Sequence, residues 1–184
     1  MPKPKRGAGV AVAFVAGPGH APVPDVTMEY SMTESSPNYW IIVSSPENWQ
    51  RTIDRGFTIH GFKSRQRKKA ELMRPGDKIV SYITGDKAFG GVLTIASEYF
   101  EEHDNPIWVS DGKKSGGEDY PFRVKVEKDV WLPSSDRVPA EPIAKRMEYT
   151  KRWPEKNWTL AFQGNVHQIS ESDYAFIREA IDGK

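Results

Sequence analysis

The chain contains no cysteine. This absence excludes disulfides, thiol catalysis and thiolate metal sites, and it is compatible with a reducing cytoplasm, where we expect the protein to act. No apolar run approaches the roughly 18 residues that a membrane-spanning helix needs. The net charge is only +1, which excludes a polycation that coats nucleic acid by charge alone.

Signatures of catalysis and of metal binding are also missing. No Gly-x-Ser-x-Gly elbow occurs, and Gly112-Lys113-Lys114-Ser115 has Ile107 where a phosphate loop requires glycine. The histidines are scattered without metal-binding spacing, at His20, His60, His103 and His167. We therefore expect no resident metal or cofactor, and a binding module rather than an enzyme.

The first 37 residues are rich in proline, glycine, alanine and valine and have no lasting period. This composition predicts a disordered leader over 1–37 and a folded domain over 38–184. A signal peptide is the alternative, because Lys3, Lys5 and Arg6 precede the apolar run from Val10 to Ala16. That run is at the short limit for export and is interrupted by small residues.

The remaining sequence predicts an α+β fold, a small mixed β-barrel, closed or nearly closed, with flanking helices. Ser44 or Ser45 caps a helix that begins at Pro46 and ends near Arg55. We expect a short basic helix at 67–73 and a closing helix at 170–181, where Ser170 and Asp173 form a capping box. Strands are expected at 39–44, 78–84, 89–97, 122–127 and 158–162, with 57–62 extended or irregular. Trp40 and Trp158, inside strands, are expected in the core.

Charge is unevenly distributed along this domain. Residues 55–78 carry eight Lys and Arg against two acids, whereas residues 98–119 carry seven acids against two lysines. We expect one face that attracts phosphate and another that repels it, the alternative being two ordinary solvated loops. The expected phosphate-binding residues are Lys63, Arg65, Arg67, Lys68 and Lys69.

Planar and polar residues gather at the ends of the expected strands. Their convergence would form a pocket with flat walls, amide groups and a basic mouth, which suits a flipped or single-stranded base. The candidate residues are Ser45, Asn48, Trp49, His60, Gly61, Phe62, Lys63, Tyr82, Ile83, Thr84, Phe162, Gly164 and Asn165. Each aromatic taken singly is more often core, Trp49 is evenly balanced, and His60 is more often structural.

The ordered set of motifs resembles an EVE domain of the PUA-like superfamily, related to YTH domains. The matching motifs are Tyr39 to Val43, Glu47-Asn48-Trp49, Gly61, Arg74 to Lys78, Tyr120 to Val126, Trp158, Phe162-x-Gly164 and Ile169 to Ile177. The resemblance implies a PUA-like barrel and a nucleic-acid ligand whose modified base enters an aromatic pocket at the positions above. This chain has His60 where close relatives tend to have tryptophan.

The resulting hypothesis is a non-enzymatic module that recognises a modified base in DNA or RNA. Phe62, Trp49 or Phe162 would stack on the base, and Asn48, Ser45 or Asn165 would read its edge. Two alternatives remain open: a nucleic-acid-processing enzyme with His60 or His167 as general base, and a protein-interaction module that uses exposed tryptophans.

Overall fold

The computed structural model describes residues 36–108 and 120–184. Most of the predicted leader therefore lies outside the described residues, as does much of the acidic segment at 98–119. Within the described ranges, no helix has the length and apolar character needed to cross a lipid bilayer.

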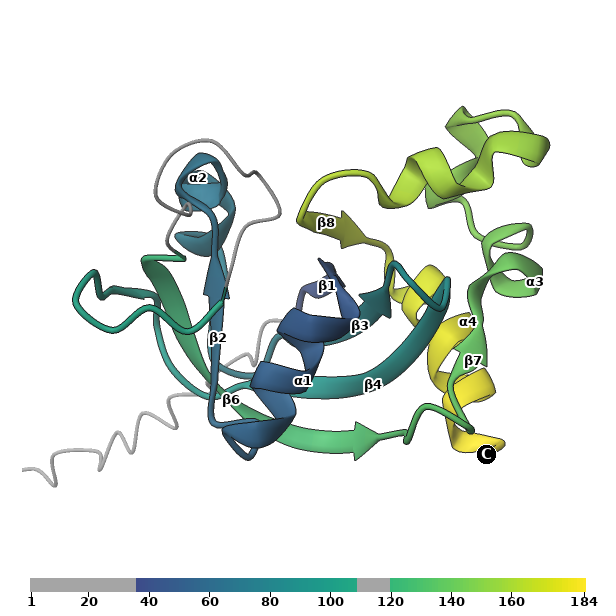
Figure 1. Cartoon of the computed structure of the whole chain (residues 1–184). Helices are drawn as coiled ribbons and strands as arrows, with labels where there is room; N and C mark the ends of the chain where they lie inside the picture. The colour runs from purple at the N-terminus through teal and green to yellow at the C-terminus, as the bar shows by residue number, and fades with distance from the viewer. Residues whose placement is uncertain (1–35, 109–119) are drawn as a thin grey trace, which may run out of the picture. The chain divides into compact units, whose positions relative to one another are not determined.

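A curled mixed sheet forms the centre of the domain (Figure 1). Its main path runs β2-β6-β4-β3-β1-β8, with β5 paired to β6 and β7 paired to β4. β1 and β3 are parallel, and the other pairs are antiparallel. The strands are β1 Tyr39–Ser44, β2 Ile59–Phe62, β3 Lys78–Ile83, β4 Ala88–Ile95, β5 Phe100–Glu101, β6 Phe122–Trp131, β7 Val138–Pro139 and β8 Val166–Ile169. Because β2 and β8 end this path without pairing to each other, the sheet is a half-barrel.

Short helices flank the sheet. They are α1 Pro46–Asp54, α2 Arg67–Ala70, α3 Ala140–Ala144 and α4 Glu171–Asp182, with 3₁₀ segments η1 Ser64–Gln66, η2 Tyr149–Arg152 and η3 Glu155–Phe162. The predicted start of α1 is confirmed, because Ser45 Oγ accepts a hydrogen bond from Asn48 N, at 3.2 Å, and Pro46 occupies the first turn. The helix ends before Gly56, whose φ of 64° suits glycine.

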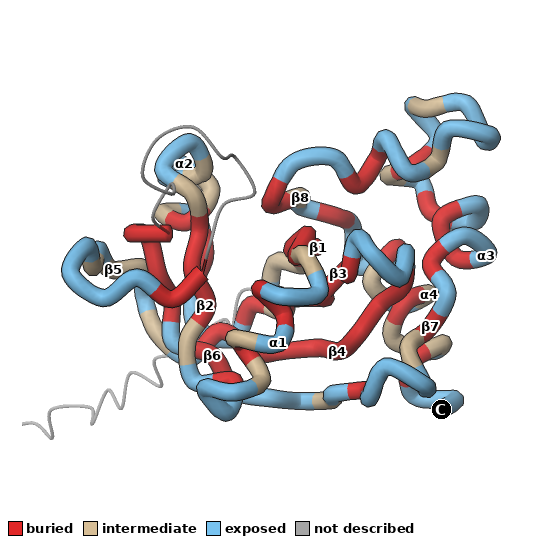
Figure 2. Tube along the Cα trace, viewed as in Figure 1, coloured by how far each residue is buried: buried red, intermediate tan, exposed pale blue. Residues whose placement is uncertain are grey.

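Two large hydrophobic clusters pack against the sheet, and Figure 2 shows that β1, β3 and β4 are buried along most of their length. Alternate residues of β1 serve both clusters: Trp40 and Ile42 join the cluster that includes Trp49 of α1, whereas Ile41 and Val43 join the one that includes Ile177 of α4. The continuous apolar run of β1 thus has the two-faced burial that its sequence predicted. Trp40 is 1% exposed, which confirms its predicted place in the core.

Two local predictions were wrong. Residues 158–162 are not a strand: they lie in η3, Trp158 is only partly buried, and the last strand is β8. The capping box at α4 is only half made. Ser170 Oγ accepts from Asp173 N at 3.2 Å, but the Asp173 carboxylate instead accepts from Glu148 N and Tyr149 N, at 2.8 and 2.9 Å. This carboxylate therefore fastens η2 to α4.

The described part of the acidic segment contacts the basic one, contrary to the expectation of separate faces. Arg67 forms ion pairs with Glu71, at 2.8 Å, and with Glu101, at 3.4 Å. Arg74 lies 3.4 Å from Glu98. The described part of the acidic segment therefore neutralises part of the basic one.

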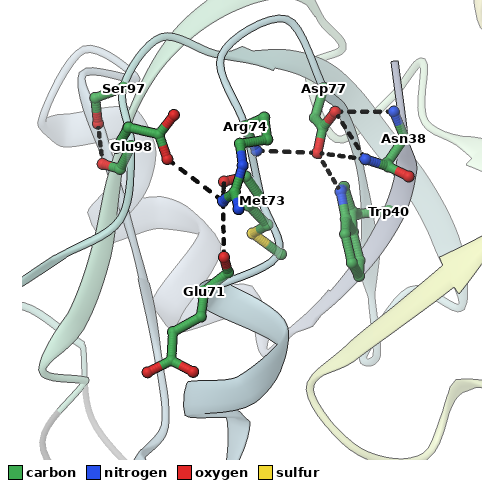
Figure 3. Close-up of polar contacts among 8 residues, drawn as sticks. All are labelled: Asn38, Trp40, Glu71, Met73, Arg74, Asp77, Ser97 and Glu98. Atoms are coloured by element: carbon green, nitrogen blue, oxygen red, sulfur yellow. Dashed lines mark hydrogen bonds and ion pairs between the residues drawn. The ribbon is translucent and has the colours of Figure 1, made fainter. Parts of the chain in front are cut away.

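Asp77 anchors the turn before β3 to the start of β1 (Figure 3). Its carboxylate, which is 2% exposed, accepts hydrogen bonds from Asn38 N at 2.8 Å, from Trp40 Nε1 at 3.0 Å and from Arg74 N at 3.1 Å. Asn38 Nδ2 also approaches both oxygens, at 3.3 Å. We call Asn38, Trp40, Arg74 and Asp77 the Asp77 cluster.

Candidate functional site

A cavity of about 130 Å³ opens between the two unpaired edges of the half-barrel. Its lining comes from the end of β1, from α1, from β2 and the residues that follow it, and from the loop before β8. Eight predicted pocket residues line it: Ser45, Asn48, His60, Gly61, Lys63, Thr84, Gly164 and Asn165. The structure thus brings together segments that are up to about 120 positions apart in the sequence.

Five other predicted pocket residues are not part of this lining. They lie in the hydrophobic clusters and are 3% exposed or less: Trp49, Phe62, Tyr82, Ile83 and Phe162. Tyr82 and Phe162 stack on each other, with ring centroids 4.4 Å apart and an interplanar angle of 13°. These aromatic faces are therefore occupied by protein, which the sequence pattern could not reveal.

The aromatic wall of the cavity is instead Trp108 and Tyr120, which sequence reasoning missed as site residues. Their ring centroids lie 5.9 Å apart, and the His60 ring lies 5.4 Å from Trp108. Trp108 Nε1 donates to Thr52 Oγ1 on α1, at 3.1 Å, which fixes the indole. Asn48 Nδ2 donates to the Tyr120 hydroxyl at 3.3 Å.

Gly61 makes this wall possible. A Cβ at this position would lie 2.3 Å from Trp108 Cζ3 and 3.0 Å from Tyr120 Cβ. Such distances are far below van der Waals contact, so only glycine lets the indole lie against β2. The space that Gly61 leaves beside the β2 backbone is thus occupied by Trp108.

Two buried polar residues of the lining have unsatisfied atoms. His60 is 3% exposed, and its Nδ1 has no hydrogen-bond partner among the described residues. Asn165 is 6% exposed; its Nδ2 donates to Val43 O at 3.3 Å, but Oδ1 has no partner there either. Burial lowers the pKa of His60 to about 4, so the imidazole is neutral at pH 7.

The predicted phosphate-binding residues divide into two groups. Lys63 and Arg65 line the cavity, and Lys68 is exposed. Arg67 is engaged by Glu71 and Glu101, and Lys69 Nζ donates to Val166 O of β8. Partial burial lowers the pKa of Lys69. The cations nearest the cavity are thus Lys63 and Arg65, whereas Arg67 and Lys69 hold protein segments together.

His167 lies beside this site but belongs to a different contact. Its Nδ1 is 2.6 Å from the Tyr149 hydroxyl, which joins β8 to η2. Its pKa is lowered to about 4, chiefly by burial and then by the charge of Lys69. No group of three or more His, Asp or Glu residues suited to a metal ion occurs within residues 36–108 and 120–184.

Comparison with known proteins places these residues in a family. The EVE domain model matches residues 38–180. A UPF0310 protein of Renibacterium salmoninarum is 32% identical over 154 residues, which are 78% of this chain and 95% of that protein. A UPF0310 protein of Pyrococcus horikoshii is 23% identical over 78% of this chain and 98% of its own length.

Solved structures share the fold at low sequence identity. The YTH domain of the Zygosaccharomyces rouxii MRB1 protein, solved in complex with N6-methyladenosine RNA, has a TM-score of 0.55 and 17% identity over 89% of this chain and 92% of its own. Human THYN1 protein, solved in complex with 5-methylcytosine-containing DNA, has a TM-score of 0.53 and 16% identity over 80% of this chain and 99% of its own. These matches agree with the predicted PUA-like fold.

Proposed function

This chain belongs to the EVE domain family, and we propose that it is a non-enzymatic module that binds nucleic acid by holding one modified base in the cavity between β1, β2 and β8. The observation that carries the proposal is the cavity itself. It combines the aromatic wall of Trp108 and Tyr120 with two amides, Asn48 and Asn165. Its volume of about 130 Å³ is close to that of an engineered cavity of about 150 Å³ that binds benzene, so one flat ring system is the scale of ligand it suits.

The comparisons support the class of ligand. The two structures of similar fold described above contain, by their own descriptions, RNA with N6-methyladenosine and DNA with 5-methylcytosine. A shared fold at 16–17% identity supports nucleic acid as the partner and leaves the modification to be measured. In our proposal the base is turned out of its strand, at a cost of a few kcal/mol, and the cavity recovers that cost.

Each part of the lining has a role in this proposal. Trp108 and Tyr120 stack on the base in place of Trp49, Phe62 and Phe162, because the first two line the cavity and the other three do not. Asn48 and Asn165 read the base edge. Lys63 and Arg65 contact the flanking phosphates, and Arg65 is exposed without an ion pair among the described residues.

Binding is favoured over catalysis by the state of the histidines. Both His60 and His167 have pKa values lowered to about 4, whereas a general base works best when its pKa is near the operating pH. His60 also has no side-chain hydrogen bond to a carboxylate that would orient it, within the described residues. A neutral, unprotonated imidazole in a cavity wall is instead suited to contact a neutral ring.

The test is a binding screen of the purified protein by fluorescence anisotropy. Short DNA and RNA oligonucleotides carrying one modified base are compared with the unmodified sequence. We expect tighter binding of at least one modified probe, and Trp108→Ala should abolish that preference. Uniform affinity for all probes in the wild type, or a preference that survives Trp108→Ala, would contradict the proposal.

The phosphate contacts are tested by the salt dependence of binding. Replacing both Lys63 and Arg65 by glutamine should reduce the slope of log K against log salt by about 1–2, because each phosphate contact contributes about 0.9 for duplex DNA and 0.7 for single strands. Lys125→Gln, an exposed lysine on β6, is the matched control and should leave the slope unchanged.

A further inference from the structure

The tryptophans of the chain differ sharply in burial. Trp40, Trp49 and Trp108 are at most 3% exposed, whereas Trp153 and Trp158 are partly exposed and line one groove of about 380 Å³. A large aromatic side chain that keeps part of its face accessible is typical of binding surfaces. The cavity does not account for these two residues, because neither lines it.

Neighbouring aromatic rings and a hydrophobic cluster hold the two tryptophan rings in place. Trp153 lies 5.6 Å from the Tyr149 ring, and Trp158 meets Phe162 edge-on at 5.9 Å. The Arg152 guanidinium lies over the Trp153 ring, 5.3 Å from its centroid, so a base would stack chiefly on Trp158. Both tryptophans pack against the hydrophobic cluster that contains Ile177 of α4. Rings fixed in this way lose little conformational freedom when a ligand stacks on them.

The charge around the groove favours an anionic ligand. Residues 144–158 contain five Lys and Arg against two glutamates. Lys145 and Lys151, which line the groove, form ion pairs with glutamates, so the charge available to a ligand is that of the other cations. Arg152 has no ion pair within the described residues. Lys156, on the rim that Trp158 shares, is exposed and has no ion pair within the described residues. Cations interleaved with aromatic faces are the pattern by which single-stranded nucleic acid is held.

The groove is also within reach of the cavity. Trp158 precedes Gly164, which lines the cavity, by only six residues, so their backbones are separated by at most about 20 Å. The hydrogen bond of 2.6 Å between Tyr149 and His167 fastens η2 to β8 beside the same loop. Figure 1 shows η3 leading directly through this loop into β8.

We propose that the groove of Trp153 and Trp158 is a second binding site, which stacks unpaired bases adjacent to the base held in the cavity. This inference rests on the proposed function. The groove would contribute affinity without sequence preference, since every base has a face to stack. The protein would therefore require a single-stranded or locally opened segment rather than one extruded base in an otherwise intact duplex.

The experiment compares two single-stranded probes that carry the same modified base. One has ordinary neighbours, and the other has abasic sites at the neighbouring positions. In the wild type, loss of the neighbouring bases should weaken binding by about 5- to 150-fold for one stacked base. In Trp158→Ala the two probes should bind equally, while the preference for the modified over the unmodified base remains.

A second variant tests the groove even if Trp158→Ala does not fold. Lys156→Gln removes an exposed charge and should lower the salt slope for the intact strand by about 0.7, with Lys184→Gln as control. Suppose that the wild type prefers the modified base but binds the intact and abasic probes equally well. That result would overturn this inference and leave the proposed function standing. Absence of any preference among probes would overturn the proposed function, and this inference with it.

Discussion

The Asp77 cluster and the cavity are both buried polar sites, but they differ in how completely their groups are satisfied. The Asp77 carboxylate accepts three hydrogen bonds of 2.8–3.1 Å. In the cavity wall, His60 Nδ1 and Asn165 Oδ1 have no partner among the described residues. A buried polar atom that neither protein nor water pairs costs about 1–3 kcal/mol, so a ligand that supplied partners for these two atoms would gain affinity.

This difference separates a structural role from a binding role. The Asp77 cluster joins β1 to the turn before β3, and its groups have nothing further to offer a ligand (Figure 3). The cavity wall keeps polar groups and aromatic faces that a ligand can satisfy. Substitutions in the first site should therefore act on stability, and those in the second chiefly on binding.

The largest effect on stability is expected from Asp77→Ala. The substitution leaves Trp40 Nε1 buried, and the Arg74 backbone N–H partly buried, without their acceptor, and we expect it to lower the free energy of unfolding by about 3–5 kcal/mol. Urea denaturation followed by tryptophan fluorescence measures the change. Asp104→Ala, at an exposed position, should change it by less than about 0.5 kcal/mol. Equal losses of stability in the two variants would show that the Asp77 hydrogen bonds do not stabilise the fold.

The next largest effect is expected from acidification, through His60. Its pKa is about 4 in the folded protein and 6.5 in the unfolded chain, so between these values the unfolded chain binds more protons. Stability should therefore be fully present above pH 6.5 and fall as the pH drops towards 4, by about 3 kcal/mol in total. His167 has a pKa shift of the same sign and adds to the loss.

Denaturant titrations at several pH values test this dependence. His60→Gln should make the curve less steep between pH 4 and 6.5, because a group that cannot be protonated no longer favours the unfolded chain, and the slope that remains is that of His167. His103→Gln is the matched control, since His103 has a 64% exposed side chain. A wild-type curve that is level through this window would show that His60 is not held neutral by burial.

Local signals predicted much of the fold and less of the site. The strand at 39–44 and the Ser45 cap followed from patterns within ten residues, and both are present. Trp158 was misplaced because its neighbours read as a strand, whereas the chain there forms 3₁₀ turns packed on Phe162. Trp108 and Tyr120 were missed because they flank an aperiodic stretch. The pairing of β2 with β6 and the packing of Trp108 on Gly61 bring them together, and no local pattern shows this.

Gly61→Ala tests the cavity wall with a smaller cost in stability. The added methyl group overlaps Trp108, so we expect a loss of about 1–3 kcal/mol in unfolding free energy and of tenfold or more in affinity for the preferred modified probe. Gly183→Ala, where a Cβ meets only ordinary contacts of 3.5 Å or more, should change neither. Unaltered binding by Gly61→Ala would mean that Trp108 does not contact the ligand.

Asn165→Ala should have the smallest effect on stability and still impair binding. The substitution removes one long hydrogen bond, to Val43 O at 3.3 Å, together with an oxygen that has no partner in the described structure. Losing the hydrogen bond destabilises the fold, and removing the unpaired oxygen stabilises it by a similar amount. The free energy of unfolding should therefore change by less than about 1 kcal/mol. Binding of the modified base should weaken by about tenfold, because the base edge loses its acceptor.

The matched comparison for Asn165→Ala is Asn38→Ala in the Asp77 cluster, which removes a side-chain donor to a buried carboxylate. We expect the reverse pattern there, with a larger loss of stability and no change in binding. Anisotropy and denaturation measured on both proteins decide the matter. If Asn165→Ala proved the more destabilising of the two while binding stayed intact, Asn165 would be a structural residue and the unsatisfied oxygen would not mark a binding site.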